Sequence, residues 1–173
     1  SIDANVLLVR AGALYHDIGK MNNPAFFTEN QHGVNPHDAL SPQQSARIVI
    51  GHVNDGLKRA EKAKLPHVIR DFISQHHGQG KAKYFYMTYC NEHPDEDVDP
   101  QPFTYPGPNP QSRETSILMM ADSVEAASRS LKDHSADEIA NLVNRIIDSQ
   151  IVDGLHNDSL LSFKDVKEIK EVF

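Results

Sequence analysis

The sequence predicts one all-α domain, and three observations support this fold class. Apolar side chains recur at helical spacing in successive segments, and clear helix-start and helix-stop signals separate these segments. No segment shows the sustained alternation of apolar and polar residues that is typical of a half-buried strand. The chain has 173 residues, of which 39% are hydrophobic, and this is enough for one core. We therefore expect a single helical domain over residues 1–173.

The N-terminal part of the chain is predicted to form a helix followed by a loop. Residues 4–15 have the apolar spacing of a helix. Residues 22–40 are rich in Asn, Pro, His and Gly, which favour loops. The apolar positions of the predicted helix are Val6, Leu7, Ala13 and Leu14.

Two helices are expected in the next segment. Ser41 and Pro42 indicate a helix start, because a serine side chain can cap free backbone N–H groups and proline fits the first turn. This helix is expected to end at about residue 64. Pro66 begins a shorter helix, and Gly78 is suited to end it, since glycine readily adopts the left-handed conformation found there.

The C-terminal half is predicted to contain four helices and one long loop. An aromatic helix is expected over 81–91, and the acidic, proline-rich stretch 91–110 is too polar and too interrupted for a core element, so it is interpreted as a surface loop. A helix follows at about 112–131. The sequence Ser-Ala-Asp-Glu at 135–138 has the capping-box pattern and begins a helix with a regular apolar stripe. A short helix at 163–172 completes the chain.

Composition excludes several classes of protein. The formal net charge is −7, which argues against a protein that binds long nucleic acid through its phosphates, because that mode requires clustered Lys and Arg. One cysteine, Cys90, excludes an internal disulfide framework and fits a reducing compartment. No apolar run approaches the length of a membrane-spanning helix. We expect the chain itself to be soluble.

Histidine is unusually abundant, with ten residues in the chain. Imidazole nitrogens and carboxylate oxygens are the ligands of zinc, manganese, iron and related ions. Neighbouring side chains on a helix diverge by about 100° and do not easily chelate one ion, so adjacent ligand pairs are more useful at helix ends or between two ions. Both adjacent pairs fall at predicted helix ends. The residues of this metal-binding type, in chain order, are His16, Asp17, His52, His76, His77 and Asp122.

The pattern His16-Asp17-Ile18-Gly19-Lys20 resembles the signature of the HD superfamily of metal-dependent phosphohydrolases, whose fold is a helical bundle. The later histidines and Asp122 follow the order seen in its two-metal, HD-GYP-like branch. More narrowly, the chain is similar to the seven-transmembrane HD (PgpH-type) proteins over nearly its whole length. The segments that carry this closer resemblance are 15–21, 26–31, 35–38, 75–78, 84–86, 105–108 and 121–126.

This resemblance implies a phosphodiesterase that hydrolyses cyclic di-AMP to the linear dinucleotide pApA at a dinuclear iron or manganese site. It implies that Asp17 bridges two divalent transition-metal ions. One ion would be held by His16 and Asp122, and the other by the three later histidines His52, His76 and His77.

The resemblance also implies that the chain is the cytoplasmic domain of a bacterial inner-membrane protein. The pattern of the family includes a further histidine on an upstream helix, and residues 1–15 contain none. We therefore expect the chain to be a fragment that lacks that helix and the membrane region. The ion near His16 and Asp122 would then be short of one protein ligand and less fully occupied than the other.

Four further residues are candidates for contacts with the substrate. Lys20 completes the signature and could donate to a phosphate oxygen, and Arg113 is a candidate phosphate contact or the partner in a surface ion pair. Asn30 could contact a nucleobase edge or hold a turn. Tyr105 could stack on adenine or belong to the core.

Two other functions remain open at this point. The first is an HD-GYP-like phosphodiesterase that acts on cyclic di-GMP, although the Gly-Tyr-Pro signature of that family is absent and Gly78 follows the His-His pair where those proteins usually have an acidic residue. The second is a non-catalytic HD module that binds a nucleotide and only signals. The nearly complete set of ligand residues argues against the second.

Overall fold

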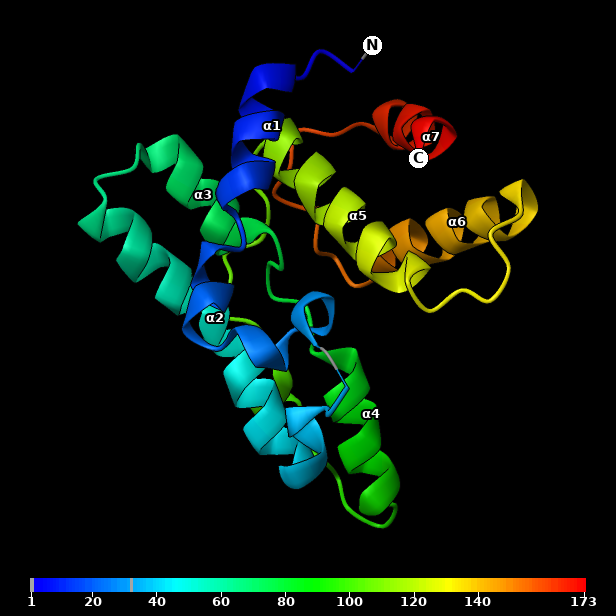
Figure 1. Ribbon diagram of the computed structural model, residues 1–173. Coiled ribbons are helices and arrows are strands. Elements are labelled where there is room, and N and C mark those ends of the chain that lie inside the picture. Colours follow the sequence, from blue (N-terminus) through cyan, green and yellow to red (C-terminus); the bar gives the residue numbers. More distant parts are fainter. Residues whose placement is uncertain (1, 32) are drawn as a thin grey trace.

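Helices dominate the computed structural model, which describes residues 2–31 and 33–173 and contains no strand within these residues (Figure 1). The predicted all-α fold is therefore confirmed. The helices are α1 (Val6–Tyr15), α2 (Pro42–Lys62), α3 (His67–Gln75), α4 (Lys83–Glu92), α5 (Arg113–Ser128), α6 (Ala136–Val152) and α7 (Phe163–Val172).

The segment between α1 and α2 is a succession of short 3₁₀ turns rather than an irregular loop. The turns are Ile18–Asn22, Pro24–Phe26, Thr28–Asn30 and Pro36–Ala39. Each is only three to five residues long, as is usual for this tight helix type. This segment follows His16 and Asp17 directly, so its path decides what lies beside them.

Local signals at the ends of α2 and α3 act as predicted. The hydroxyl oxygen of Ser41 accepts a hydrogen bond from the backbone N–H of Gln44, and the Gln44 side chain accepts one from the Ser41 N–H, which completes a capping box. Helix α3 ends at Gln75. Gly78 follows it with a φ of +52°, in the left-handed region that glycine adopts without strain.

Helix α1 packs against α3 and α5, α2 packs against α3 and α4, and α5 packs against α6, as the arrangement in Figure 1 shows. A Cβ atom on Gly12 would overlap the ring of Phe72, so this glycine permits the close approach of α1 and α3. The large apolar side chains that are almost completely buried include Phe72, Ile73, Phe103, Met120, Val143 and Ile147.

Large apolar residues of α1 are exposed, although their helical spacing predicts that they face the core. Val6, Leu7 and Leu14 are 69%, 76% and 80% exposed. The buried position of this helix is Gly12, which faces α3. Helix α1 thus packs against the rest of the domain through the face that carries the small residue Gly12, and its exposed large apolar side chains lie on other faces.

Two local predictions were wrong. The stretch 91–110 is not only a surface loop, because Phe103 is 1% and Tyr105 is 8% exposed, and the backbone N–H of Tyr105 donates to the carbonyl oxygen of Gly80 at 2.8 Å. Ser135 precedes α6 but makes no side-chain cap. Its hydroxyl donates instead to Asp133, whose carboxylate also accepts the Ser135 backbone N–H.

Candidate metal centre

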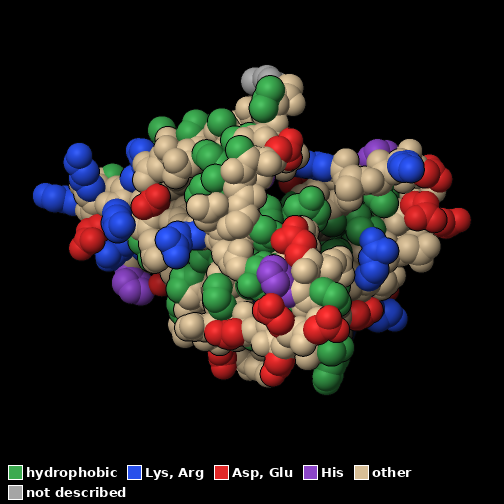
Figure 2. All heavy atoms as spheres, turned by 90° about the horizontal axis from the view of Figure 1, so that it is seen from below, with side chains coloured by type: hydrophobic (Ala, Val, Ile, Leu, Met, Phe, Trp, Pro, Cys, Tyr) green, Lys and Arg blue, Asp and Glu red, His purple; other side chains and the backbone are tan. Residues whose placement is uncertain are grey.

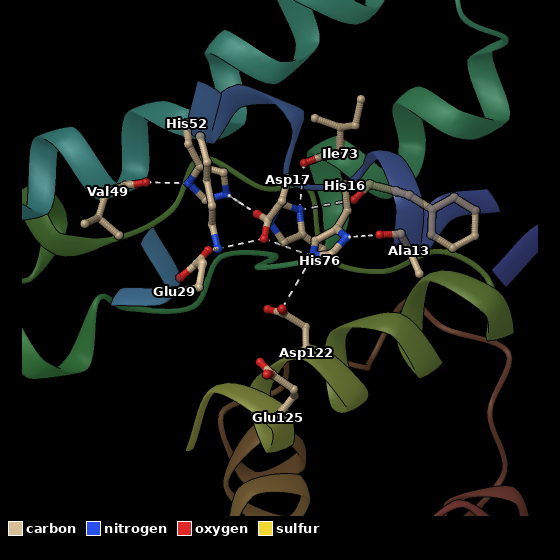
Figure 3. A network of polar contacts seen from close by, with 12 residues as sticks. Ala13, His16, Asp17, Glu29, Val49, His52, Ile73, His76, Asp122 and Glu125 are labelled. Atoms are coloured by element: carbon tan, nitrogen blue, oxygen red, sulfur yellow. Dashed lines mark hydrogen bonds and ion pairs between the residues drawn. The ribbon is translucent and has the colours of Figure 1, made fainter. Parts of the chain in front are cut away.

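Six side chains of metal-binding type converge from four parts of the fold, and Figure 3 shows five of them: His16, Asp17, His52, His76 and Asp122. His16 and His76 are the residues that end α1 and α3, and each is followed by its partner in the sequence. The prediction that both adjacent pairs lie at helix ends is therefore confirmed. His52 comes from the middle of α2, and Asp122 comes from α5.

These side chains form two groups, and within each group the potential ligand atoms lie within 4.8 Å of one another. One group is His52, His76 and His77; the other is His16, Asp17 and Asp122. This division matches the one that the family resemblance implies.

The carboxylate of Asp17 lies between the two groups. Its Oδ2 atom is 3.2 Å from Nε2 of His16, and its Oδ1 atom is 3.2 Å from Nε2 of His52. Nε2 of His76 is 3.6 Å from the same Oδ1 atom. Asp122 approaches only its own group, with Oδ1 3.4 Å from Nε2 of His16. Asp17 therefore presents one oxygen to each group, which is the arrangement that a bridging ligand requires.

Backbone carbonyl groups orient the imidazole rings. Nδ1 of His16, His52 and His76 each lies against the main-chain carbonyl oxygen of the residue three positions earlier (Figure 3). A carbonyl oxygen only accepts, so Nδ1 carries the proton and donates, and Nε2 of the neutral ring keeps its lone pair. This is the arrangement by which histidine ligands are held for a metal ion.

We call His52, His76 and His77 the buried group, and two of its nitrogen atoms are placed as ligands of one cation would be. Nε2 of His52 lies 3.1 Å from Nε2 of His76. With Nδ1 protonated in both rings, two lone pairs face each other, which is unfavourable unless a positive charge lies beside both. Nitrogen ligands at right angles around an ion, with bonds of about 2.1 Å, would be about 3 Å apart. The observed separation therefore fits two ligands of one ion.

The electrostatics of the second group also fit a cation. Burial opposes the charged form of His16, but the carboxylates of Asp122 and Asp17 outweigh it and raise the pKa of His16 to about 10. Burial alone would raise the pKa of Asp17, whereas its histidine neighbours hold that pKa well below its usual range. Nε2 of His16 and Oδ1 of Asp17 are buried and have no hydrogen-bond partner of normal geometry. The two carboxylates therefore favour a positive charge beside Nε2 of His16, which either a second proton on the ring or a bound cation in its place can supply.

Burial favours the neutral forms of His76 and His77. Burial lowers the pKa of His76 and, more strongly, that of His77, and the neighbouring imidazoles add to the effect. Neutral imidazole is the form that binds a metal ion. All six donors are nitrogen or carboxylate oxygen atoms, without a thiolate, and this set suits iron, manganese, zinc and related ions.

The two groups open into a cleft of about 860 Å³. The molecular face seen in Figure 2 is hollowed, with hydrophobic and acidic side chains at the hollow and most basic ones toward the sides. Hydrophobic side chains from the 3₁₀ turns, from α4 and from α5 supply much of the cleft wall: Phe26, Phe27, Tyr84, Phe85, Leu118 and Ala121.

Two of the four candidate substrate contacts lie in this cleft. Nζ of Lys20 is 2.7 Å from Asp17 Oδ2, beside the metal-binding groups. Tyr105 lines the cleft but is almost fully buried, with its ring centroid 4.2 Å from that of His77. Arg113 lies at the opposite end of α5 from the cleft-lining part, and neither it nor Asn30 is among the residues that line the cleft.

Several cleft residues were not singled out from the sequence. His37 lies between the rings of Phe26 and Phe85, at centroid distances of 5.2 and 5.0 Å. Its contacts are tertiary, and no local pattern indicates them. Glu125 and Arg129 also line the cleft, and they follow Asp122 at helical spacing. The spacing could have indicated both residues, because it places Glu125 and the C-cap residue Arg129 on the same side of α5 as Asp122.

Comparisons with known proteins agree with this geometry. The family model described as "HD domain" matches residues 1–127. The chain is 42% identical over 170 residues to the cyclic-di-AMP phosphodiesterase PgpH of Bacillus subtilis; this covers 98% of the chain but only 24% of that protein. The crystal structure of the PgpH HD domain of Listeria monocytogenes superposes with a TM-score of 0.92 at 38% identity, covering 98% of this chain and 79% of that one. The same domain in complex with cyclic di-AMP gives a TM-score of 0.94 at 40% identity, with the same coverage.

Proposed function

This chain belongs to the HD-domain family, and we propose that it is a metal-dependent phosphodiesterase that hydrolyses cyclic di-AMP to the linear dinucleotide pApA. The observation that carries the proposal is the position of Asp17, with one carboxylate oxygen toward each of two ligand groups at the floor of an open cleft. The similarity to PgpH proteins supports the choice of substrate.

The proposed reaction needs positive charge at the phosphate. A phosphodiester is an anion, so it repels a hydroxide nucleophile and its transition state gathers negative charge on oxygen. Two divalent transition-metal ions, iron or manganese in our proposal, would supply this positive charge and would make a water molecule more acidic.

Two different groups of residues in this chain would hold these ions. The three histidines of the buried group would hold one ion and His16 and Asp122 the other, and Asp17 would contact both. Lys20 lies beside Asp17 and can donate a hydrogen bond to a phosphate oxygen.

The remainder of the cleft suits a nucleotide. Its volume of about 860 Å³ is near the upper end of the range for small-molecule pockets, which is about 300–1,000 Å³. Tyr84 is 76% exposed at the cleft edge and its ring centroid lies 5.3 Å from that of Phe85. Exposed aromatic rings of this kind provide stacking surfaces for a purine base.

We also propose that the domain acts in the cytoplasm as part of a bacterial inner-membrane protein. The chain spans 24% of the length of the curated PgpH relative that it matches. The family resemblance supports the membrane part of this proposal. Within the described residues, none of the helices has the length and hydrophobicity of a membrane-spanning segment.

A turnover assay with two nucleotides tests the proposal. The protein is incubated with Mn²⁺ or Fe²⁺ and equal concentrations of cyclic di-AMP and cyclic di-GMP, and the products are separated by chromatography. We expect pApA to form faster than the guanine product, and a chelator to abolish both reactions. Faster cleavage of cyclic di-GMP would favour an HD-GYP-like function. Tight binding of cyclic di-AMP without any product would indicate a non-catalytic signalling module.

A further inference from the structure

A carboxylate joins two basic side chains at the wall of the cleft. Oε1 of Glu29 is 2.7 Å from Nζ of Lys20, and Oε2 of Glu29 is 3.3 Å from Nη1 of Arg129. Arg129 also contacts Glu125, with Nη2 at 2.8 Å and Nε at 2.9 Å from the same carboxylate oxygen. Glu29 therefore offers one oxygen to each of two cations that come from different parts of the chain.

Arg129 is held on the same face of α5 as the metal-binding Asp122. It directly follows the last residue of α5, and Glu125 lies between the two in sequence at helical spacing. Among the described residues, Lys20 and Arg129 are the only lysine or arginine side chains that line the cleft. Lys20 lies 2.7 Å from Asp17 and so belongs to the metal centre, whereas Arg129 is bound to neither ligand group.

The cyclic dinucleotide has a chemical feature that the metal centre does not use. It carries two phosphodiester groups on opposite sides of its ring, and only one of them can be cleaved at the metal centre at a time. The other phosphate keeps its negative charge and needs a partner in the cleft. A guanidinium group is suited to this role, because its N–H donors match two oxygens of one phosphate.

Glu29 has the properties of a group that this phosphate can replace. Its two oxygens are shared between Lys20 and Arg129 in the way that two oxygens of a phosphate would be. It lies on the three-residue 3₁₀ turn Thr28–Asn30, and its side chain is 31% exposed. Glu125 would remain bound to Arg129 and keep the guanidinium oriented.

We propose that Arg129 binds the second, uncleaved phosphate of a cyclic dinucleotide, and that Glu29 is the counter-ion which this phosphate displaces. The proposal rests on the proposed phosphodiesterase function and adds a specificity-determining residue to it. It predicts that Arg129 matters for a substrate with two phosphates and not for a diester with one.

The test compares two substrates in Arg129→Gln. Cyclic di-AMP has two phosphodiesters, and bis(p-nitrophenyl) phosphate has one. Loss of one charge-assisted contact should raise the KM for cyclic di-AMP by about tenfold to a hundredfold, with a smaller change in kcat. Hydrolysis of bis(p-nitrophenyl) phosphate should be unchanged. Arg145→Gln, which removes an exposed arginine of α6 outside the cleft, is the matched control and should change neither.

Binding without turnover gives a second readout. The affinity for a phosphorothioate analogue of cyclic di-AMP, measured by calorimetry, should fall by a similar factor in Arg129→Gln and only partly in Arg129→Lys, which keeps the charge. In Glu29→Gln the affinity should rise, because the competing carboxylate is gone.

The outcomes separate this proposal from the proposed function. An equal loss toward both substrates in Arg129→Gln, or unchanged binding of the analogue, would overturn the role of Arg129 while leaving the phosphodiesterase intact. If the wild-type protein cleaves neither substrate, the proposed function fails, and the binding measurements still decide whether Arg129 holds a phosphate.

Discussion

The carbonyl oxygen of His52 lies against Gly19, so closely that a Cβ atom on Gly19 would overlap it. The same contact places the backbone N–H of Gly56 next to Gly19. It presses the turn that follows Asp17 onto α2. The turn thus begins beside the helix that carries His52, and Oδ1 of Asp17 lies 3.2 Å from Nε2 of His52. The glycine of the His-Asp-Ile-Gly-Lys signature thus has a packing role next to the candidate metal centre.

Gly19→Ala should therefore damage both the fold and the site. A buried methyl group without space costs about 1–3 kcal/mol of unfolding free energy. The shifted turn should also carry Asp17 away from His52 and weaken metal binding. Chemical denaturation and metal titration measure the two effects.

Gly51→Ala is the matched control, because it changes the same residue type in α2. A Cβ atom at Gly51 meets nothing within 4 Å. Replacing a helical glycine by alanine should increase stability by about 0.5–1 kcal/mol. If Gly19→Ala were as stable as Gly51→Ala and bound metal normally, the close packing would have no structural consequence.

Local sequence patterns were sufficient to predict where several helices begin and end. Helix starts such as Ser41-Pro42 and the helix end before Gly78 depend on the chemistry of a few neighbouring residues, and they lie where expected. The ligand residues could be named because the order of histidine and aspartate resembles a known signature. Their division into two groups within 4.8 Å matches that resemblance.

The cleft wall could not be predicted from the same patterns. Glu29 contacts Arg129 across a sequence separation of 100 residues, and no local signal indicates such a pair. Tyr105 is buried although its segment is rich in proline and acidic residues. The exposed apolar side chains of α1 show the same limit, since the packing face of that helix depends on which neighbour approaches Gly12. These features arise from tertiary packing.

The two ligand groups should lose metal independently. His77→Ala removes a ligand from the buried group only, and Asp122→Ala removes one from the other group only. We expect each variant to bind one ion much more weakly than the other. Calorimetric titration together with elemental analysis resolves the two sites. Equal weakening of both ions in both variants would contradict the division into two groups.

The stability of the domain should decrease in mild acid because of His156. Burial lowers the pKa of this side chain from 6.5 to about 4. Its Nε2 atom donates to Oε1 of Gln150 at 3.0 Å, and its Nδ1 atom is buried without a partner. Between these two pKa values the unfolded chain binds a proton that the folded chain does not, so the stabilising contribution is complete above pH 6.5 and falls as the pH falls toward 4.

His156→Gln should reduce this pH dependence. The loss of stability from neutral pH to about pH 4 should be smaller than in the wild type, by about 3 kcal/mol at most. Denaturant unfolding at a series of pH values measures it. His134→Gln, at an exposed position, should retain the pH dependence of the wild type. A His156→Gln curve parallel to that of the wild type would show that His156 does not titrate as its burial predicts.

The most direct test of the shared metal centre is the rate at which Asp17→Ala converts cyclic di-AMP to pApA at saturating metal. Loss of an outer-shell partner of a metal ligand typically costs about 10–100-fold in metal affinity or activity, so loss of a ligand shared by two ions should cost more than about a hundredfold. The helical circular dichroism spectrum should be unchanged, since Asp17 lies outside the helices and is half-buried. A wild-type rate in Asp17→Ala would contradict the account, because it would mean that the carboxylate between the two ligand groups is not needed for the reaction.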